Sequence, residues 1–197
     1  MKIIVAKNLR DKRQLLCVPD NLPGWYRWWA RENDLKLLLN SKYLSKEHFD
    51  SLIGYLSKGN GDLKNFYCIY TGIAVKDSIQ ARLCWHINQT HTQSAVKSGF
   101  LSTFRQTISS LLSGDQMDEN TTNLFIDKLI VEYYSENYLI KSDEAKKAIR
   151  EIEENIMEKY IFVLNIQGNK RLEVQEFLKD LKKARQAAKK NALKGVF

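Results

Sequence analysis

The sequence predicts an α+β fold, in which strands and helices share one core. The segment Phe66–Gly72 is rich in aromatic and β-branched residues and ends in glycine, which predicts a strand stopped by a turn. From about Lys76 apolar residues recur at every fourth position, at Ile79, Leu83 and Ile87, which is typical of a helix. With 197 residues, 44% hydrophobic and 27% charged, the chain has the composition of an ordinary globular protein.

The first half of the chain contains a further predicted strand. The aromatic run Gly24–Ala30 favours a strand, and two-residue alternation puts Trp25 and Tyr26 on opposite faces of it. A dense turn signal, Pro19–Gly24, precedes this run. The other expected elements are an edge strand or strand pair within residues 1–18, two helices within 31–58, and a flexible turn at Lys58–Asp62.

The second half is predicted to be mostly helical. Ser102 and Thr103 are candidate helix caps, and their backbone amides and hydroxyls could bind an anion. Ser142 is the expected cap of a separate, long helix. Leu129–Tyr134 predicts a third strand. The remaining expected elements are a polar loop at 89–94, a short helix within 115–128 and a basic amphipathic helix at Asn169–Phe197.

Charge and cysteine content narrow the class of protein. A net charge of +8 and a pI near 9.3 favour a polyanionic partner, although basic small proteins are common. No apolar run is long enough to cross a bilayer, so no membrane association is expected. Cys17, Cys68 and Cys84 are odd in number and lack a Cys-x-x-Cys spacing, which disfavours a disulfide framework or zinc knuckle. We therefore expect a cytoplasmic protein with reduced cysteines.

Arg82 and His86 carry the first hint of chemistry. They are four residues apart on one predicted helix, so their side chains lie one turn apart on the same face. A guanidinium is a permanent, forked phosphate ligand, and an imidazole can carry or accept a proton near neutral pH. Most such pairs are solvated or structural, so the spacing alone does not establish a site.

Six landmarks in order give the chain a resemblance. Gly24-Trp25-Tyr26 and Tyr70-Thr71-Gly72 lie on two predicted strands, and Arg82 and His86 follow on a helix. Glu153 then begins Glu153-Glu-Asn-Ile-Met-Glu-Lys-Tyr160, which leads on to Asn165. This order resembles the GIY-YIG nuclease family, whose members include excision-repair and restriction endonucleases. The resemblance implies a small central antiparallel β-sheet flanked by helices.

The resemblance covers about residues 22–166 and departs from the family in two ways. Residues 31–64 would be a helical insertion between the first two motif strands, where the family usually has a short connection. Trp25 stands where isoleucine is usual, and Thr71 also departs from the motif, but neither position is catalytic in the family. We therefore expect an N-terminal extension at 1–21, a nuclease domain at 22–166 and a basic C-terminal helix at 167–197.

By resemblance, the chain is expected to be a divalent-metal-dependent DNA endonuclease acting in restriction, defence, mobile-element or repair biology. Glu153 would hold one Mg²⁺ (or Mn²⁺), and Arg82 would bind the scissile phosphate. Tyr26 and Tyr70 would position the attacking water, with one of them as general base and His86 able to take up the phenolic proton. Asn165 would orient a neighbouring group by hydrogen bonding.

Several alternatives stay open from the sequence. Tyr70 could be filler in a strand, Glu153 cannot be chosen over Glu151 and Glu154 without the family spacing, and Glu132 is a fallback carboxylate. A catalytically silent nucleic-acid-binding or protein-interaction module on the same fold is the alternative function. A double-strand cutter would need a homodimer or sequential nicking. Candidate DNA contacts are Arg82, His91, Ser102, Lys179, Lys182, Lys183 and Arg185.

Overall fold

The computed structural model describes residues 1–135 and 142–197. In this part of the chain the strands form one four-stranded antiparallel sheet in the order β1-β4-β2-β3. The strands are β1 (Lys2–Val5), β2 (Gly24–Arg31), β3 (Phe66–Ala74) and β4 (Ile130–Tyr134). The predicted α+β class and antiparallel sheet are confirmed, and β2 lies in the middle, where it pairs with both β3 and β4.

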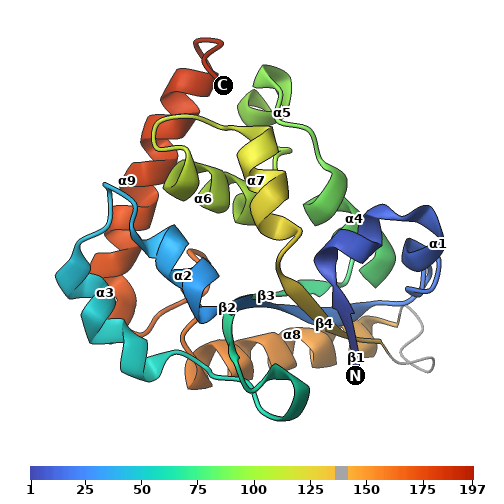
Figure 1. Cartoon of the computed structure of the whole chain (residues 1–197). Helices are drawn as coiled ribbons and strands as arrows, with labels where there is room; N and C mark the ends of the chain where they lie inside the picture. Colours follow the sequence, from blue (N-terminus) through green and yellow to red (C-terminus); the bar gives the residue numbers. More distant parts are fainter. Residues whose placement is uncertain (136–141) are drawn as a thin grey trace.

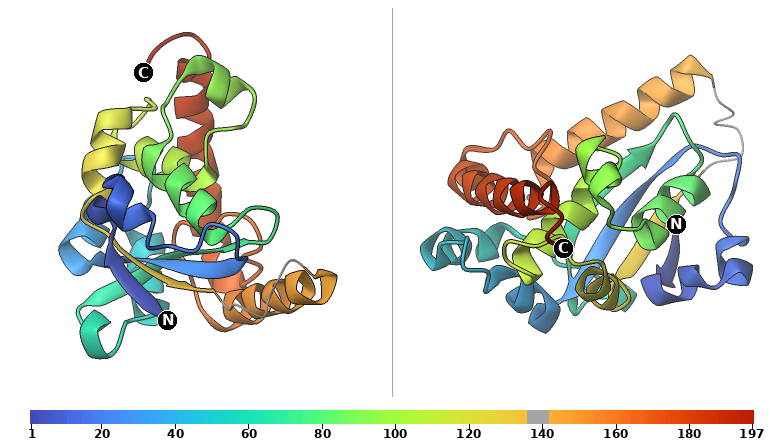
Figure 2. Two further views of the ribbon diagram at one scale, coloured as in Figure 1. Left: turned by 90° about the vertical axis from the view of Figure 1, so that its right-hand side faces the viewer. Right: turned by 90° about the horizontal axis from the view of Figure 1, so that it is seen from above.

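Helices cover both faces of this sheet. Figure 1 shows the long helix α8 on one face, and α2, α4, α6 and α7 on the other. The α-helices are α1 (Lys12–Leu15), α2 (Glu32–Leu39), α3 (Lys46–Leu52), α4 (Ile79–Asn88), α5 (Gln93–Lys97), α6 (Thr103–Leu112), α7 (Glu119–Ile126), α8 (Asp143–Lys159) and α9 (Gln175–Ala192). Short 3₁₀ helices are η1 (Ala6–Arg10), η2 (Ile53–Tyr55), η3 (Gly61–Leu63) and η4 (Leu172–Val174). The side view in Figure 2 separates the two helical layers.

Alternation along β2 divides the core in two. Tyr26 and Trp28 point into the larger cluster beneath α4 and α6, while Trp29 points into a smaller one on the α8 face. The larger cluster includes Phe104 of α6, whose ring centre lies 4.7 Å from that of Trp28. The smaller cluster contains Met157 of α8. The predicted separation of neighbouring side chains on this strand therefore holds in the fold.

A β-bulge decides where Tyr70 points. The register between β2 and β3 shifts between Trp28 and Trp29, so that Trp28 pairs with Tyr70 but Trp29 pairs with Cys68. Cys68 belongs to the cluster on the α8 face, whereas both Ile69 and Tyr70 pack into the cluster on the opposite face. An uninterrupted two-residue period would have put Tyr70 on the same face as Cys68. The bulge therefore brings Tyr70 to the face that carries Tyr26.

The outer edge of β3 is covered by two segments distant in sequence. The amide of Cys68 donates to the carbonyl of Ser57 at 2.9 Å, and the amide of Leu164 donates to the carbonyl of Ile69 at 2.9 Å. Since an open strand edge exposes unpaired backbone groups, these contacts protect the sheet. They also fix the segment around Leu164 beside the strand that carries Tyr70.

The helical insertion predicted between the motif strands is present as α2 and α3 with η2 and η3. The edge strand expected within residues 1–18 is present as β1, followed by the helices η1 and α1. Two expectations for other segments were wrong in detail: the strand expected to stop at Gly72 continues to Ala74, and the loop at 89–94 runs into α5. Ser102 and Ser142 do cap α6 and α8, as predicted.

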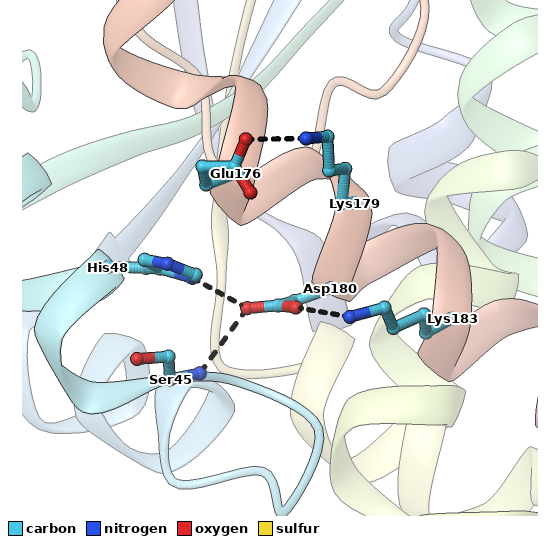
Figure 3. A network of polar contacts seen from close by, with 6 residues as sticks. All are labelled: Ser45, His48, Glu176, Lys179, Asp180 and Lys183. Carbon is cyan, nitrogen blue, oxygen red and sulfur yellow. Dashed lines mark hydrogen bonds and ion pairs between the residues drawn. The ribbon is translucent and has the colours of Figure 1, made fainter.

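The basic C-terminal helix is docked against the rest of the protein. Phe177, Leu181 and Ala184 of α9 are buried in the main core. Figure 3 shows Asp180 of α9 contacting the insertion, where it lies 2.8 Å from Nδ1 of His48 and accepts from the amide of Ser45 at 3.4 Å. The helix and the insertion therefore support each other, while the domain divisions at residues 21 and 166 stay predictions.

The glycine at position 72 is required by packing. It pairs with Tyr26 across β2 and β3, and a Cβ placed there would lie 2.5 Å from the Tyr26 Oη. We predict that Gly72→Ala lowers the free energy of unfolding by about 1–3 kcal/mol through overpacking, as measured by urea denaturation. The control is Gly54→Ala, because a Cβ there meets no atom within 4 Å. Equal stability of the two variants would contradict this account of Gly72.

Candidate active site

A chain of hydrogen bonds starts from the tyrosine of the first motif. The Tyr26 Oη lies 2.7 Å from Nε2 of His86, and Nδ1 of His86 lies 3.2 Å from Oγ of Ser102. Tyr26 is 2% exposed and His86 is 1% exposed, so both contacts are shielded from water. Ser102 is also the cap of α6, where its Oγ accepts from the amide of Arg105 at 3.1 Å. The start of α6 therefore sets the orientation of the His86 ring.

His86 is neutral in this environment. Burial lowers its pKa to about 3, with further lowering by the positive charges of Arg82 and Arg105. A neutral imidazole has one donor and one acceptor nitrogen. In the tautomer that donates from Nδ1 to Ser102, Nε2 is free to accept the proton of Tyr26.

Tyr70 stands beside Tyr26 on the same face of the sheet. Their ring centres are 6.4 Å apart, and Tyr70 packs 4.8 Å from the ring of Phe104. Burial raises the pKa of Tyr70, and a hydrogen-bonding interaction with Thr103 lowers it. Tyr70 is half-buried and lines an open cavity.

Nearby charged side chains shift the pKa values of Tyr26 and Tyr70. Burial is the largest cause that raises the pKa of Tyr26 and of Tyr70, and the negative charge of Glu153 raises both further. The positive charge of Arg82 lowers the pKa of both. The interaction of Tyr26 with the side chain of Tyr70 also raises the pKa of Tyr26. Arg82 and Glu153, which are far apart in sequence, therefore lie close enough to act on the same pair of phenols.

The cavity beside Tyr70 has a volume of about 620 Å³. Its lining brings together strand β3, the start of α6, helix α8, the segment after α8 and helix α9. The polar side chains that matter to its chemistry are those of Tyr70, Thr103, Glu153, Glu154, Asn165 and Arg185. Four of these six come from the last quarter of the chain, so the site depends on how α8 and α9 dock.

Glu153 has the character of a cation ligand. It is half-buried on α8, and burial, followed by the charge of Glu154, raises its pKa. Within the described residues, no cluster of three or more His, Cys, Asp or Glu side chains is arranged to hold a metal. Mg²⁺ keeps most of its water and is often bound by only one or two carboxylates. A half-buried carboxylate facing an open, polar cavity that Glu154 also lines therefore fits a hydrated ion of this kind.

Asn165 holds the strand that carries Tyr70. Its Oδ1 accepts from the amide of Thr71 at 2.9 Å, and its Nδ2 donates to the carbonyl of the same residue at 2.9 Å. The side-chain amide thus pairs with both free backbone groups of Thr71 at the outer edge of β3. Asn165 lines the cavity, but this paired geometry makes it a positioning residue for Tyr70.

The sequence matches the GIY-YIG catalytic domain family over residues 24–187. The chain belongs to the GIY-YIG family. No curated protein and no solved structure is significantly similar to it. The matched range includes all six motif residues and most of α9, which the sequence had led us to treat as an appendage.

Arg82 of α4 lies at the surface next to the two tyrosines. It donates from Nη2 to Asp77 at 3.0 Å, and its guanidinium lies 4.8 Å from the ring centre of Trp85. Its Nε is buried and has no hydrogen-bond partner in the described structure. Because Asp77 is largely exposed, a phosphate could replace it as the anion paired with Arg82.

Two candidate DNA contacts are occupied inside the protein. The Nδ1 of His91 donates to the carbonyl of Met117 at 2.9 Å, and its Nε2 accepts from Nε of Arg105 at 3.0 Å. Both ring nitrogens of His91 are thus used, and neither is free to bind phosphate. Ser102 is fully buried, and its hydroxyl serves His86 and the start of α6 instead.

The four candidate DNA-binding cations of α9 differ in their ion pairing and exposure. Figure 3 shows Lys179 paired with Glu176 and Lys183 paired with Asp180, at 2.5 and 3.3 Å. Lys182 is exposed to solvent. Arg185 lies on the side of the helix that reaches the cavity. These four cations cannot be separated from the sequence, because their burial depends on the docking of α9.

Glu132 is a structural carboxylate. It accepts from Nε1 of Trp29 at 3.2 Å and forms an ion pair with Nε of Arg27 at 3.0 Å, on the α8 face of the sheet. The fallback role considered for it is therefore not supported. Sequence reasoning also missed Arg105, which is fully buried and donates to the carbonyls of His86 and Ile87 at 3.0 and 3.1 Å. No local pattern distinguishes this arginine from a solvated one.

Both buried histidines make the stability of the protein dependent on pH. Burial lowers the pKa of His86 to about 3 and that of His91 to about 4, whereas an unfolded histidine titrates near 6.5. Below pH 6.5 the unfolded chain therefore binds protons that the folded chain does not, so stability is lost as the pH falls.

We predict that the free energy of unfolding falls by up to about 1.4 kcal/mol per pH unit for each of these histidines between pH 6.5 and 5. Urea denaturation at several pH values measures this slope. The His91→Gln variant is the control and should show a shallower slope. A slope near zero for the unmodified protein over this range would mean that the histidines are not buried in neutral form.

Proposed function

We propose that the protein is a divalent-metal-dependent endonuclease that hydrolyses DNA phosphodiester bonds. The observation that carries this proposal is that Tyr70 and Glu153 line one cavity. The ring of Tyr26 packs beside that of Tyr70, and Tyr26 is hydrogen-bonded to His86. Membership of the GIY-YIG family supports a nuclease activity. The basic composition supports DNA as the substrate.

Glu153 is the residue that would hold the cation. A bound Mg²⁺ or Mn²⁺ supplies Lewis acidity at the phosphate and at the leaving oxygen. Burial and the negative charge of Glu154 raise the pKa of Glu153, so binding of a cation would lower it again.

The two tyrosines and His86 provide a route for the proton of the attacking water. Formation of a free phenolate is unfavourable, because burial raises the pKa of both phenols. A phenol that receives a proton as it gives its own away avoids this cost. Tyr26 is the phenol that would pass its proton on, to Nε2 of His86 at 2.7 Å from its Oη. Because the pKa of His86 is lowered to about 3, this transfer would have to coincide with the build-up of negative charge at the phosphate and would be reversed as that charge is lost.

Two further residues complete the proposed centre. Arg82 would bind the scissile phosphate and offset the charge that develops there, exchanging the exposed Asp77 for the substrate. Asn165 would keep Tyr70 in place through its paired hydrogen bonds to Thr71.

Setting and assembly are also part of the proposal. No helix in the described residues is long and apolar enough to span a membrane. We propose a cytoplasmic location, which the free thiols of Cys17, Cys68 and Cys84 support. One such centre cleaves one strand, so double-strand cleavage would proceed through a homodimer or by two successive nicks.

The test is cleavage of supercoiled plasmid in the presence of Mg²⁺. We expect nicked or linear DNA, with activity lost in chelator and reduced at least about 100-fold in Glu153→Gln. Glu151→Gln is the matched control, because Glu151 is exposed on the same helix and should be dispensable.

Two results would contradict this assignment. Equal cleavage by Glu153→Gln and the unmodified protein would place the activity elsewhere. Tight DNA binding without cleavage under several divalent metals would favour a catalytically silent binding module.

A further inference from the structure

Arg185 differs from the other cations of α9 because it lies in the active-site cavity. Its Nη2 donates to Oε1 of Gln106 at 3.1 Å. Gln106 is buried, and its own Nε2 donates to the carbonyl of Leu101 at 2.5 Å, which fixes the direction of its Oε1. The guanidinium is therefore held in place from α6 instead of being free to swing into solvent.

In the part of the chain that the structure describes, the charge of Arg185 has no anionic partner. Within the described residues no carboxylate lies within ion-pair distance of it, whereas Lys179 and Lys183 on the same helix are paired. Its Nε is buried and has no hydrogen-bond acceptor there. Burial also lowers the pKa of its guanidinium. A half-buried cation without a counter-charge is costly to the fold, which indicates that an external anion completes it.

The neighbours of Arg185 identify the class of anion. The positive charges of Arg185 and Arg82 both lower the pKa of Tyr70. The side chain of Thr103 lines the same cavity as Arg185. An arginine fork with an adjacent hydroxyl matches the oxygens of a phosphate group. The cavity of about 620 Å³ can hold such a group beside a hydrated cation.

We propose that Arg185 binds a phosphate of the DNA strand within the active-site cavity, as a second phosphate-binding arginine beside Arg82. This inference rests on the proposed nuclease function for its substrate. It makes α9 part of the active site, with Gln106 as the positioning residue that holds the guanidinium. The paired lysines of α9 remain outside this contact.

The experiment measures DNA binding separately from cleavage. Binding of a fluorescent DNA duplex is followed by anisotropy in EDTA, where no metal-dependent cleavage occurs, at several salt concentrations. Arg185→Gln should weaken binding about tenfold and reduce the salt dependence by about one phosphate contact. The DNA affinity of Arg185→Lys should fall between those of the unmodified protein and Arg185→Gln, because lysine keeps the charge but lacks the forked guanidinium.

The matched control is Lys189→Gln, which removes an exposed charge one helical turn further along α9. It should change binding less than twofold. Inorganic phosphate is titrated as a competitor: millimolar competition against the unmodified protein that disappears in Arg185→Gln also supports a phosphate site. Thermal unfolding verifies that the variants remain folded.

The outcomes separate the two proposals. If Arg185→Gln and Lys189→Gln bind DNA equally well, the phosphate contact is overturned even when the plasmid is cleaved. If Arg185→Gln alone weakens binding but the unmodified protein never cleaves DNA, the contact stands and the nuclease proposal fails.

Discussion

The pairing of β2 with β3, with its bulge between Trp28 and Trp29, is the constraint on which the site depends. Regular pairing would send Tyr70 to the α8 face, away from Tyr26. The bulge turns Tyr70 toward Phe104 and His86 instead. Gly72 then lies flat beneath the ring of Tyr26, where any side chain would collide with it. One irregularity in the pairing of β2 with the edge strand β3 thus brings the two phenols together.

Burial is what gives these groups their proposed chemistry, and it also opposes ionisation. It holds His86 neutral and so leaves an imidazole nitrogen available to Tyr26, while it makes phenolates unfavourable. Charges at the edge of the site act against this cost, with Arg82 and Arg185 both lowering the pKa of Tyr70. The centre therefore combines a dry proton route with a polar cavity in which charge can be compensated.

The sequence predicted the elements and the order of the motif residues better than their environments. Helix periodicity was sufficient for α4 and α8, because each buries one face, and the aromatic run Gly24–Ala30 was sufficient for β2. It could not predict the bulge, since one extra residue in a pair leaves no local signal. It also could not separate buried Arg105 or cavity-lining Arg185 from solvated cations, because long-range docking decides their partners.

The family resemblance identified Glu153 among neighbouring carboxylates. In the fold Glu153 and Glu154 both line the cavity, Glu153 half-buried and Glu154 exposed, while Glu132 is bound to Arg27. The most direct measurement of the central claim is anomalous scattering from a crystal soaked in Mn²⁺. We expect one strong peak bonded to a Glu153 carboxylate oxygen, inside the cavity that Tyr70 lines. Its absence there, with a strong peak at another carboxylate, would contradict the proposed hydrolytic centre.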